Sequence, residues 1–200
     1  MLDYDVEAPD YDRTRGGTAR PAAAAAAIAS LLPAGTRTLL DVAGGTGSVG
    51  TALTGHGLSV LVADASLGML ALAASRLPGR VLRADARRLP IADRSVDAVT
   101  SVWLLHLLPG PADVAAVVAE AARVLRPGGV YLTTVDRSAA HLHRPADPAA
   151  TDAVGTVTAV AARSGLIPAG STRFIGVGQG RPGVGDGSDP VFTLLSLRRG

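Results

Sequence analysis

The stretch Thr38–Gly50 reads TLLDVAGGTGSVG, and it decides the fold that the sequence predicts. Its first five residues, 38–42, have the apolar character of a buried strand, and a glycine-rich turn follows at 44–47. Glycine lets the backbone turn sharply and approach a ligand closely. A strand that passes through such a turn into a helix predicts an open α/β sheet, with a ligand site beyond the carboxyl ends of its strands.

Strand-like runs alternate with segments of helical periodicity on both sides of this turn. Such alternation predicts a doubly wound, Rossmann-like sheet that is mostly parallel. The expected strands lie at residues 38–42, 58–63, 80–84, 96–103, 130–135, 172–177 and 191–198. The expected helices lie at residues 18–33, 48–55, 66–76, 111–125 and 149–164.

The two ends of the chain depart from this alternation. Residues 1–17 are polar and have no periodicity, so no helix or strand is expected there. The connection at 178–190 is rich in glycine and leaves no room for a crossover helix between the last two expected strands. We therefore expect a C-terminal antiparallel β-hairpin, which gives a seven-stranded sheet within one domain, 1–200.

Composition and charge exclude several classes of protein. The 200 residues, 48% hydrophobic and 18% charged, suit one folded domain. Cysteine, lysine and asparagine are absent, which excludes disulfides, thiolate metal sites and Schiff-base chemistry. A net charge of +2 without a basic block gives no footprint for nucleic acid. No apolar run reaches the ~18 residues of a membrane span, and the acidic N-terminal stretch is unlike a secretory signal, so we expect a cytoplasmic protein.

The glycine-rich turn allows two interpretations, a dinucleotide-binding site and a site for a cationic cofactor. Residues 45–50 match the G-x-G-x-x-G fingerprint of dinucleotide-binding proteins, and Asp64 suits a ribose hydroxyl in either interpretation. Asp41, directly before the glycines, suits a cationic cofactor better than a pyrophosphate. A second acid, Asp85, ends the third expected strand, and the terminal hairpin leaves no second domain to hold a hydride acceptor. These features favour a site for a cationic cofactor over a dinucleotide-binding site.

The combined motifs LLDVAGGTG (39–47), LVADAS (61–66), RADA (83–86) and RVLRPGG (123–129) make the sequence resemble the class I S-adenosylmethionine (SAM) methyltransferases of the small UbiE-like, or type 11, branch. The resemblance covers roughly residues 9–135, and Ala43 replaces the first glycine of the family's D-x-G-x-G-x-G loop.

This resemblance implies SAM as cofactor and S-adenosylhomocysteine as product. It implies O- or N-methylation of a small-molecule acceptor, in bacterial secondary metabolism, by a monomer or homodimer. Two alternatives stay open: a SAM-binding regulator or partner protein without catalysis, and an NAD(P)-dependent oxidoreductase.

The resemblance also assigns roles to single residues. Asp41 and the backbone of 43–47 would surround the methionine part of SAM, Asp64 its ribose and Asp85 its adenine. The N-terminal segment 1–20 would fold over the cofactor and bring Tyr11 and Arg15, and less clearly Arg20, to its carboxylate. The expected cofactor-binding residues are Tyr11, Arg15, Asp41, Ala43, Gly44, Gly45, Gly47, Asp64, Ala65, Ser66, Met69, Asp85, Ala86 and Ser101.

His106, just past the fourth expected strand, is the candidate catalytic base, because histidine titrates near neutral pH and a hydroxyl acceptor must lose its proton. A packing role is the alternative. Trp103, His106, His141 and His143 are the expected substrate-binding residues, and the loops 136–148 and 176–189 are expected on the substrate side. The pair of histidines lacks further spaced ligands, so no metal is expected.

Overall fold

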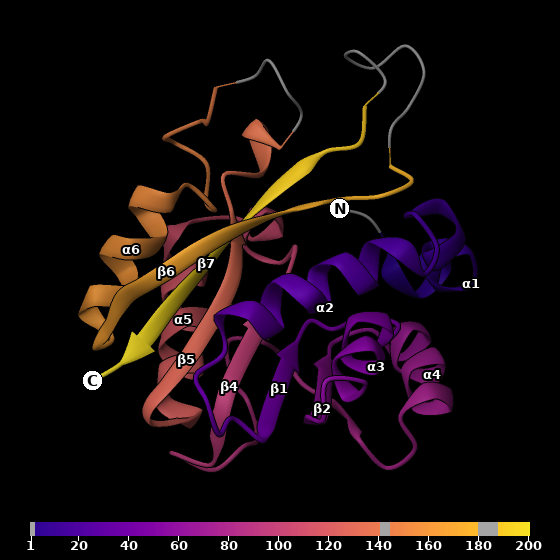
Figure 1. Cartoon of the computed structure of the whole chain (residues 1–200), viewed down its shortest axis with the longest axis horizontal. Coiled ribbons are helices and arrows are strands. Elements are labelled where there is room, and N and C mark those ends of the chain that lie inside the picture. The colour runs from indigo at the N-terminus through magenta and orange to yellow at the C-terminus, as the bar shows by residue number, and fades with distance from the viewer. Residues whose placement is uncertain (1–2, 141–144, 180–187) are drawn as a thin grey trace.

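In the computed structural model, which describes residues 3–140, 145–179 and 188–200, a seven-stranded sheet lies between two layers of helices (Figure 1). The strand order is β3-β2-β1-β4-β5-β7-β6. Neighbouring strands pair in parallel from β3 to β5, and β7 runs antiparallel to both β5 and β6. The strands are β1 (Thr38–Val42), β2 (Ser59–Asp64), β3 (Val81–Arg83), β4 (Val96–Ser101), β5 (Leu125–Val135), β6 (Leu166–Ile175) and β7 (Val191–Arg199).

The helices divide between the two faces of the sheet. The bounds are α1 (Tyr4–Thr14), α2 (Ala19–Leu31), α3 (Ser48–Thr54), α4 (Leu67–Arg76), α5 (Pro111–Val124) and α6 (Val154–Arg163), with short 3₁₀ turns η1 (Leu105–Leu107) and η2 (Arg137–Ala139). Buried residues of α2, α3 and α4 share one hydrophobic cluster, and those of α5 and α6 share the other. In the part of the chain that the structure describes, no helix is long and apolar enough to cross a membrane.

The central strands are apolar throughout because both of their faces are covered. On β1, Leu39 packs into the cluster beneath α2 and α3, and its neighbour Leu40 packs into the cluster beneath α5 and α6. Both side chains are almost completely buried. The expected α/β class, the seven strands and the C-terminal hairpin are thereby confirmed.

The helix α1 was not expected from the sequence. Only Ala8 of α1 is buried, so the helix lacks the apolar stripe that periodicity detects. Polar contacts hold it instead. Asp3 caps its first turn by accepting from the backbone N–H of Asp5 and Val6. Asp5 in turn accepts from Ser66 Oγ at 2.5 Å and from the backbone N–H of Gly68 at 2.7 Å, which docks α1 on the start of α4.

Three other elements begin several residues away from their predicted start. β5 begins at Leu125, which pairs with Val96 ahead of an irregularity in the ladder, so residues 126–129 lie within the strand. β6 begins at Leu166 because it pairs with β7 along its whole length. α6 begins at Val154, whose backbone N–H donates to Asp136 Oδ1, and residues before it form turns.

The order of the strands reverses between β1 and β4. The chain adds β2 and β3 on one side of β1 and then returns to place β4 on the other side. The connections leave the sheet in opposite directions at this point, which opens a crevice beyond the carboxyl ends of the strands. The glycine-rich turn after β1 lies there.

Candidate active site

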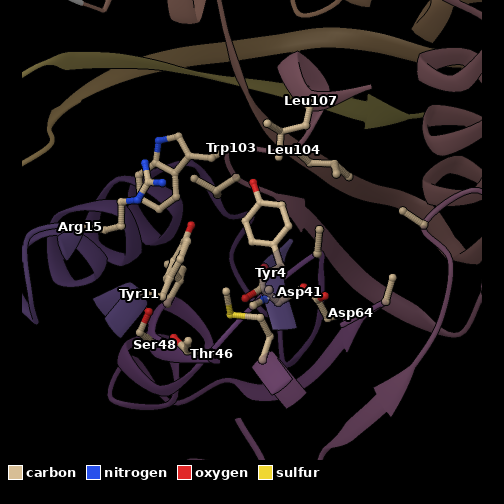
Figure 2. Close-up of a pocket in the computed structure, with 18 of the residues that line it drawn as sticks. Tyr4, Tyr11, Arg15, Asp41, Thr46, Ser48, Asp64, Trp103, Leu104 and Leu107 are labelled. Atoms are coloured by element: carbon tan, nitrogen blue, oxygen red, sulfur yellow. Dashed lines mark hydrogen bonds between the residues drawn. The ribbon is translucent and has the colours of Figure 1, made fainter. Parts of the chain in front are cut away.

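A cavity of about 390 Å³ lies beyond the carboxyl ends of β1, β2, β3 and β4 (Figure 2). Its floor includes Asp41, the loop 43–46 and Asp64. Residues of α1 and of the α1–α2 connection cover it, and residues 102–104 and 107–109 form a further wall. The volume falls within the range of small-molecule sites, and the walls are mainly apolar.

The turn after β1 is shaped by left-handed backbone conformations. Ala43 has φ 56°, an uncommon value for a residue with a Cβ atom. Gly44 admits no side chain, because a Cβ there would lie 2.7 Å from Asp41 Oδ2. The loop therefore rests directly on the Asp41 carboxyl group, and its backbone remains open to the cavity.

Asp41 is buried at the end of β1, with 2% of its surface exposed. Its Oδ1 accepts a hydrogen bond of 2.9 Å from Thr100 Oγ1, whereas Oδ2 has no partner among the residues described. Burial raises the pKa of Asp41 from 3.8 to about 7, and the Thr100 hydroxyl opposes this only in part. A buried carboxylate with a vacant oxygen beside a cavity fits a positively charged ligand group.

Asp64 ends β2 and ties the loop to the next strand. Its Oδ2 accepts from the backbone N–H of Gly45 at 2.8 Å, and its Oδ1 accepts from the backbone N–H of Ser66 at 2.9 Å. Burial raises the pKa of Asp64, and these amides act in the opposite direction. Each oxygen keeps a free lone pair, so the carboxylate can still accept from two hydroxyl groups.

Asp85 lies at the cavity's rim beside Ala86, and its carboxylate already has a partner. Arg87 donates to Asp85 Oδ2 at 2.7 Å and to Asp113 Oδ1 at 2.7 Å, which lowers the pKa of Asp85. Asp85 does not cap a helix, since a turn from Asp85 to Arg88 follows and no helix begins there. Arg87 itself lines the cavity and was not expected.

The helix α1 forms the cover of the cavity. Tyr4 and Tyr11 lie seven residues apart on one face of α1, and Figure 2 shows both rings projecting into the cavity. Their ring centroids are 6.2 Å apart, and the Arg15 guanidinium lies 5.5 Å from the Tyr11 ring centroid. Asp12 holds the C-terminal end of α1 against the glycine-rich loop and α4, because its carboxylate accepts from Thr46 Oγ1 at 2.7 Å and from Arg76 at 2.6 Å. Tyr4 has no motif around it that could have marked it in the sequence.

Trp103 and Arg20 line the cavity together. Trp103 has φ 62° and its backbone N–H donates to Thr134 Oγ1 at 2.7 Å. Its ring packs edge-on against Phe174 of β6 and Phe192 of β7, so the C-terminal hairpin supports this wall. The Arg20 guanidinium carbon lies 3.4 Å from the centroid of the Trp103 ring. Burial lowers the pKa of Arg20 to about 10.

His106 lies in η1, next to Leu107 of the cavity wall, and does not line the cavity itself. Burial, with Arg137 and Arg20 nearby, lowers the pKa of His106 from 6.5 to about 3. The imidazole is therefore neutral at physiological pH and is a weak base in this state.

Most of the expected site residues meet at the cavity. They are Tyr11, Arg15, Asp41, Ala43, Gly44, Gly45, Asp64, Ala65, Met69, Asp85, Ala86 and Trp103. Gly47, Ser66, Ser101 and His106 lie outside its lining. Ser101 is completely buried and its Oγ is 2.5 Å from the Tyr131 hydroxyl, which explains why it does not reach the cavity.

His141 and His143 lie outside the described residues, as do parts of the loops 136–148 and 176–189. Within the described ranges, no group of three or more histidine, aspartate or glutamate side chains is arranged to hold a metal ion.

The fold is similar to that of SAM-dependent methyltransferases of known structure. Residues 40–133 match the family model described as Methyltransferase domain (Methyltransf_11). A solved SAM-dependent methyltransferase from Mesorhizobium loti is 25% identical, with a TM-score of 0.67 over 87% of this chain and 96% of that one.

Two curated relatives extend the likeness in sequence. An uncharacterized methyltransferase of Mycobacterium tuberculosis is 41% identical over 111 residues, which are 55% of this chain and 44% of the relative. A demethylmenaquinone methyltransferase of Renibacterium salmoninarum is 36% identical over 132 residues, which are 63% of this chain and 54% of the relative. The chain thus spans about half the length of these relatives.

Proposed function

We propose that this protein transfers a methyl group from SAM to a small-molecule acceptor, by O- or N-methylation, in bacterial secondary metabolism. One observation carries the proposal. Asp41, buried under a glycine-rich loop, leaves one carboxylate oxygen without a partner beside a cavity of small-molecule size. A cationic cofactor supplies the positively charged partner that this carboxylate oxygen lacks, whereas the carboxylate would repel a pyrophosphate.

The residues present fit SAM. Asp41 and the loop 43–46 would bind its positively charged methionine part, and Asp64 would accept from its ribose hydroxyls. Tyr11 and Arg15 would face its carboxylate, and Asp85 with Ala86 would face its adenine. When bound, SAM supplies a methyl group on a positively charged sulfur, so the reaction needs no nucleophile from the protein.

The protein's remaining task is to position the acceptor and to exclude water. The apolar side chains of Trp103, Leu104 and Leu107 line the wall from which an acceptor would approach, and α1 covers the opening. His106, next to Leu107 in η1, is our proposed proton acceptor for a hydroxyl substrate. Its neutral state suits this role, and an anion near Arg20 and Arg137 would raise its low basicity.

The test is the thermal unfolding of the protein with S-adenosylhomocysteine, SAM, NAD and NADP in parallel. A ligand that binds only the native state at a hundred times its Kd adds about 2.7 kcal/mol of stability. We expect this shift with the first two ligands and expect Asp64→Ala to abolish it. A shift with NAD or NADP alone would support an oxidoreductase. Binding of SAM without methylation of any acceptor would support a regulatory role.

A further inference from the structure

Three arginine side chains in or near the cavity form no ion pair with a described carboxylate. Arg15 and Arg20 line the cavity. Arg137 lies outside the lining, in η2, three residues after Thr134, whose Oγ1 accepts from the backbone N–H of Trp103. Arg15 and Arg137 both lower the pKa of Arg20, which shows that the three charges act on one another. No ion pair joins any of the three to a carboxylate within residues 3–140, 145–179 and 188–200.

Arg20 is the most confined of the three. Only 6% of its surface is exposed, and its Nε has no hydrogen-bond partner in the described structure. The guanidinium contacts the face of the Trp103 ring, which satisfies none of its N–H groups. Its hydrogen-bond partner is the neutral Tyr11 hydroxyl, so no described carboxylate pairs with this buried charge. A buried charge without an opposite charge is costly, and its place beside a cavity indicates a site for an anion.

Arg137 repeats this pattern. Its Nε is buried and has no partner among the described residues. The nearby acids are committed to backbone groups: Asp152 Oδ2 accepts from the Arg137 N–H at 2.8 Å, and Asp136 Oδ1 accepts from the Val154 N–H at 2.9 Å. These bonds fix the start of η2, and none of them is made by the guanidinium, whose charge acts on Asp152 without an ion pair.

SAM does not neutralise the positive charge of Arg15, Arg20 and Arg137. SAM carries one carboxylate against an ammonium and a sulfonium group, so its net charge is positive. Its single carboxylate brings one negative charge against three guanidinium groups, and Arg15 on the Tyr11 ring is the one expected to bind it. Arg20 remains at the apolar wall of Trp103, Leu104 and Leu107, and Arg137 remains in η2, where both arginines act on His106.

From this arrangement, and resting on the proposed function, we propose that the methyl acceptor is a small apolar carboxylic acid in its ionised form, whose carboxylate binds Arg20 and Arg137. The planar guanidinium fork matches a carboxylate in a bidentate manner, and apolar surroundings strengthen the contact. The anion would also offset the two positive charges that act on His106 and make its imidazole a better proton acceptor.

The experiment titrates the protein by calorimetry with benzoate, cinnamate, indole-3-acetate and octanoate, each beside its primary amide, with and without saturating S-adenosylhomocysteine. Each amide keeps the shape of its acid and removes the charge. We expect at least one carboxylate to bind about tenfold or more tighter than its amide. Arg20→Met and Arg137→Met should each abolish that preference, and Arg163→Met, at an exposed arginine of α6, should keep it.

Arg137 is only half-buried, so Arg137→Met tests the proposal even if the buried Arg20→Met variant does not fold. S-adenosylhomocysteine should bind Arg137→Met within twofold of the wild-type affinity. The inference is overturned if no carboxylate binds better than its amide, or if the preference survives in Arg137→Met. Failure of S-adenosylhomocysteine to bind the wild-type protein would overturn the proposed function instead, and the titrations without it would still decide the acceptor's charge.

Discussion

Asp41 imposes a pH dependence on folding that a single substitution removes. Below pH 3.8 its carboxyl group is protonated in the folded and unfolded states alike. Between pH 3.8 and about 7, only the unfolded state releases the proton, so the free energy of unfolding falls as the pH rises. Above pH 7 both states are ionised and the loss is complete. A pKa raised from 3.8 to about 7 corresponds to about 4 kcal/mol.

Asp41→Asn keeps the shape of the side chain and cannot ionise. We expect the variant's stability relative to the wild type to increase by about 4 kcal/mol between pH 4 and pH 8, measured by urea unfolding at several pH values. Asp10→Asn makes the same change at an exposed carboxyl group of α1 and serves as the control. A stability difference between Asp41→Asn and the wild type that does not change with pH would refute the argument that burial raises the pKa of Asp41.

The same substitution should weaken the cofactor site. Loss of a charged hydrogen-bond acceptor costs about 1.5–3 kcal/mol, which is a loss of about tenfold or more in SAM affinity at pH 8. Calorimetric titration of SAM measures it. At pH 8, Asp41→Asn would therefore raise the free energy of unfolding and weaken the binding of SAM. Unchanged SAM affinity in Asp41→Asn would show that the vacant Oδ2 does not face the cofactor.

Three further predictions concern the loop, the cover and the histidine. Ala43→Gly should raise the free energy of unfolding by about 1 kcal/mol in urea, because φ 56° strains alanine and not glycine; a destabilised variant would contradict this. Asp12→Ala removes the bonds to Thr46 and Arg76, so we expect a loss of about 1–2 kcal/mol in stability and weaker S-adenosylhomocysteine binding; full affinity would show that α1 is not part of the site. His106→Gln should gain stability relative to the wild type as the pH falls from 7 to 4. The pKa of His106 is about 3 in the folded protein against 6.5 unfolded, so protonation favours the unfolded state, and an unchanged difference would contradict its burial.

Elements with an apolar pattern were predictable from the sequence, and elements held by polar contacts were not. Leu39 and Leu40 face opposite cores, so β1 is apolar throughout and was readily recognised. Asp41 and Asp64 lie at the ends of β1 and β2, and the glycine-rich turn follows β1. The sequence placed all three at the carboxyl edge of the sheet, where the structure has them. The helix α1 escaped prediction because Asp5 and Asp12, rather than apolar residues, attach it to the domain.

The acceptor side needed the three-dimensional structure. Arg20 and Trp103 are 83 residues apart, and no spacing rule joins a guanidinium to a ring across that distance. His106 was chosen for its usual titration near neutral pH, but burial and two arginines remove that property. Local sequence shows the type of a side chain, whereas its charge state depends on neighbours that only the fold supplies.

Trp103 gives the protein a built-in optical reporter. It is the only tryptophan of the chain, so all indole fluorescence comes from a single position. That position lines the cavity and stacks on the Arg20 guanidinium. A ligand that pulls Arg20 off the ring, or that covers the ring itself, must alter the intensity or wavelength of the emission. Occupancy of the acceptor side can therefore be followed in real time by excitation of the unmodified protein, without a label and without knowing the natural substrate.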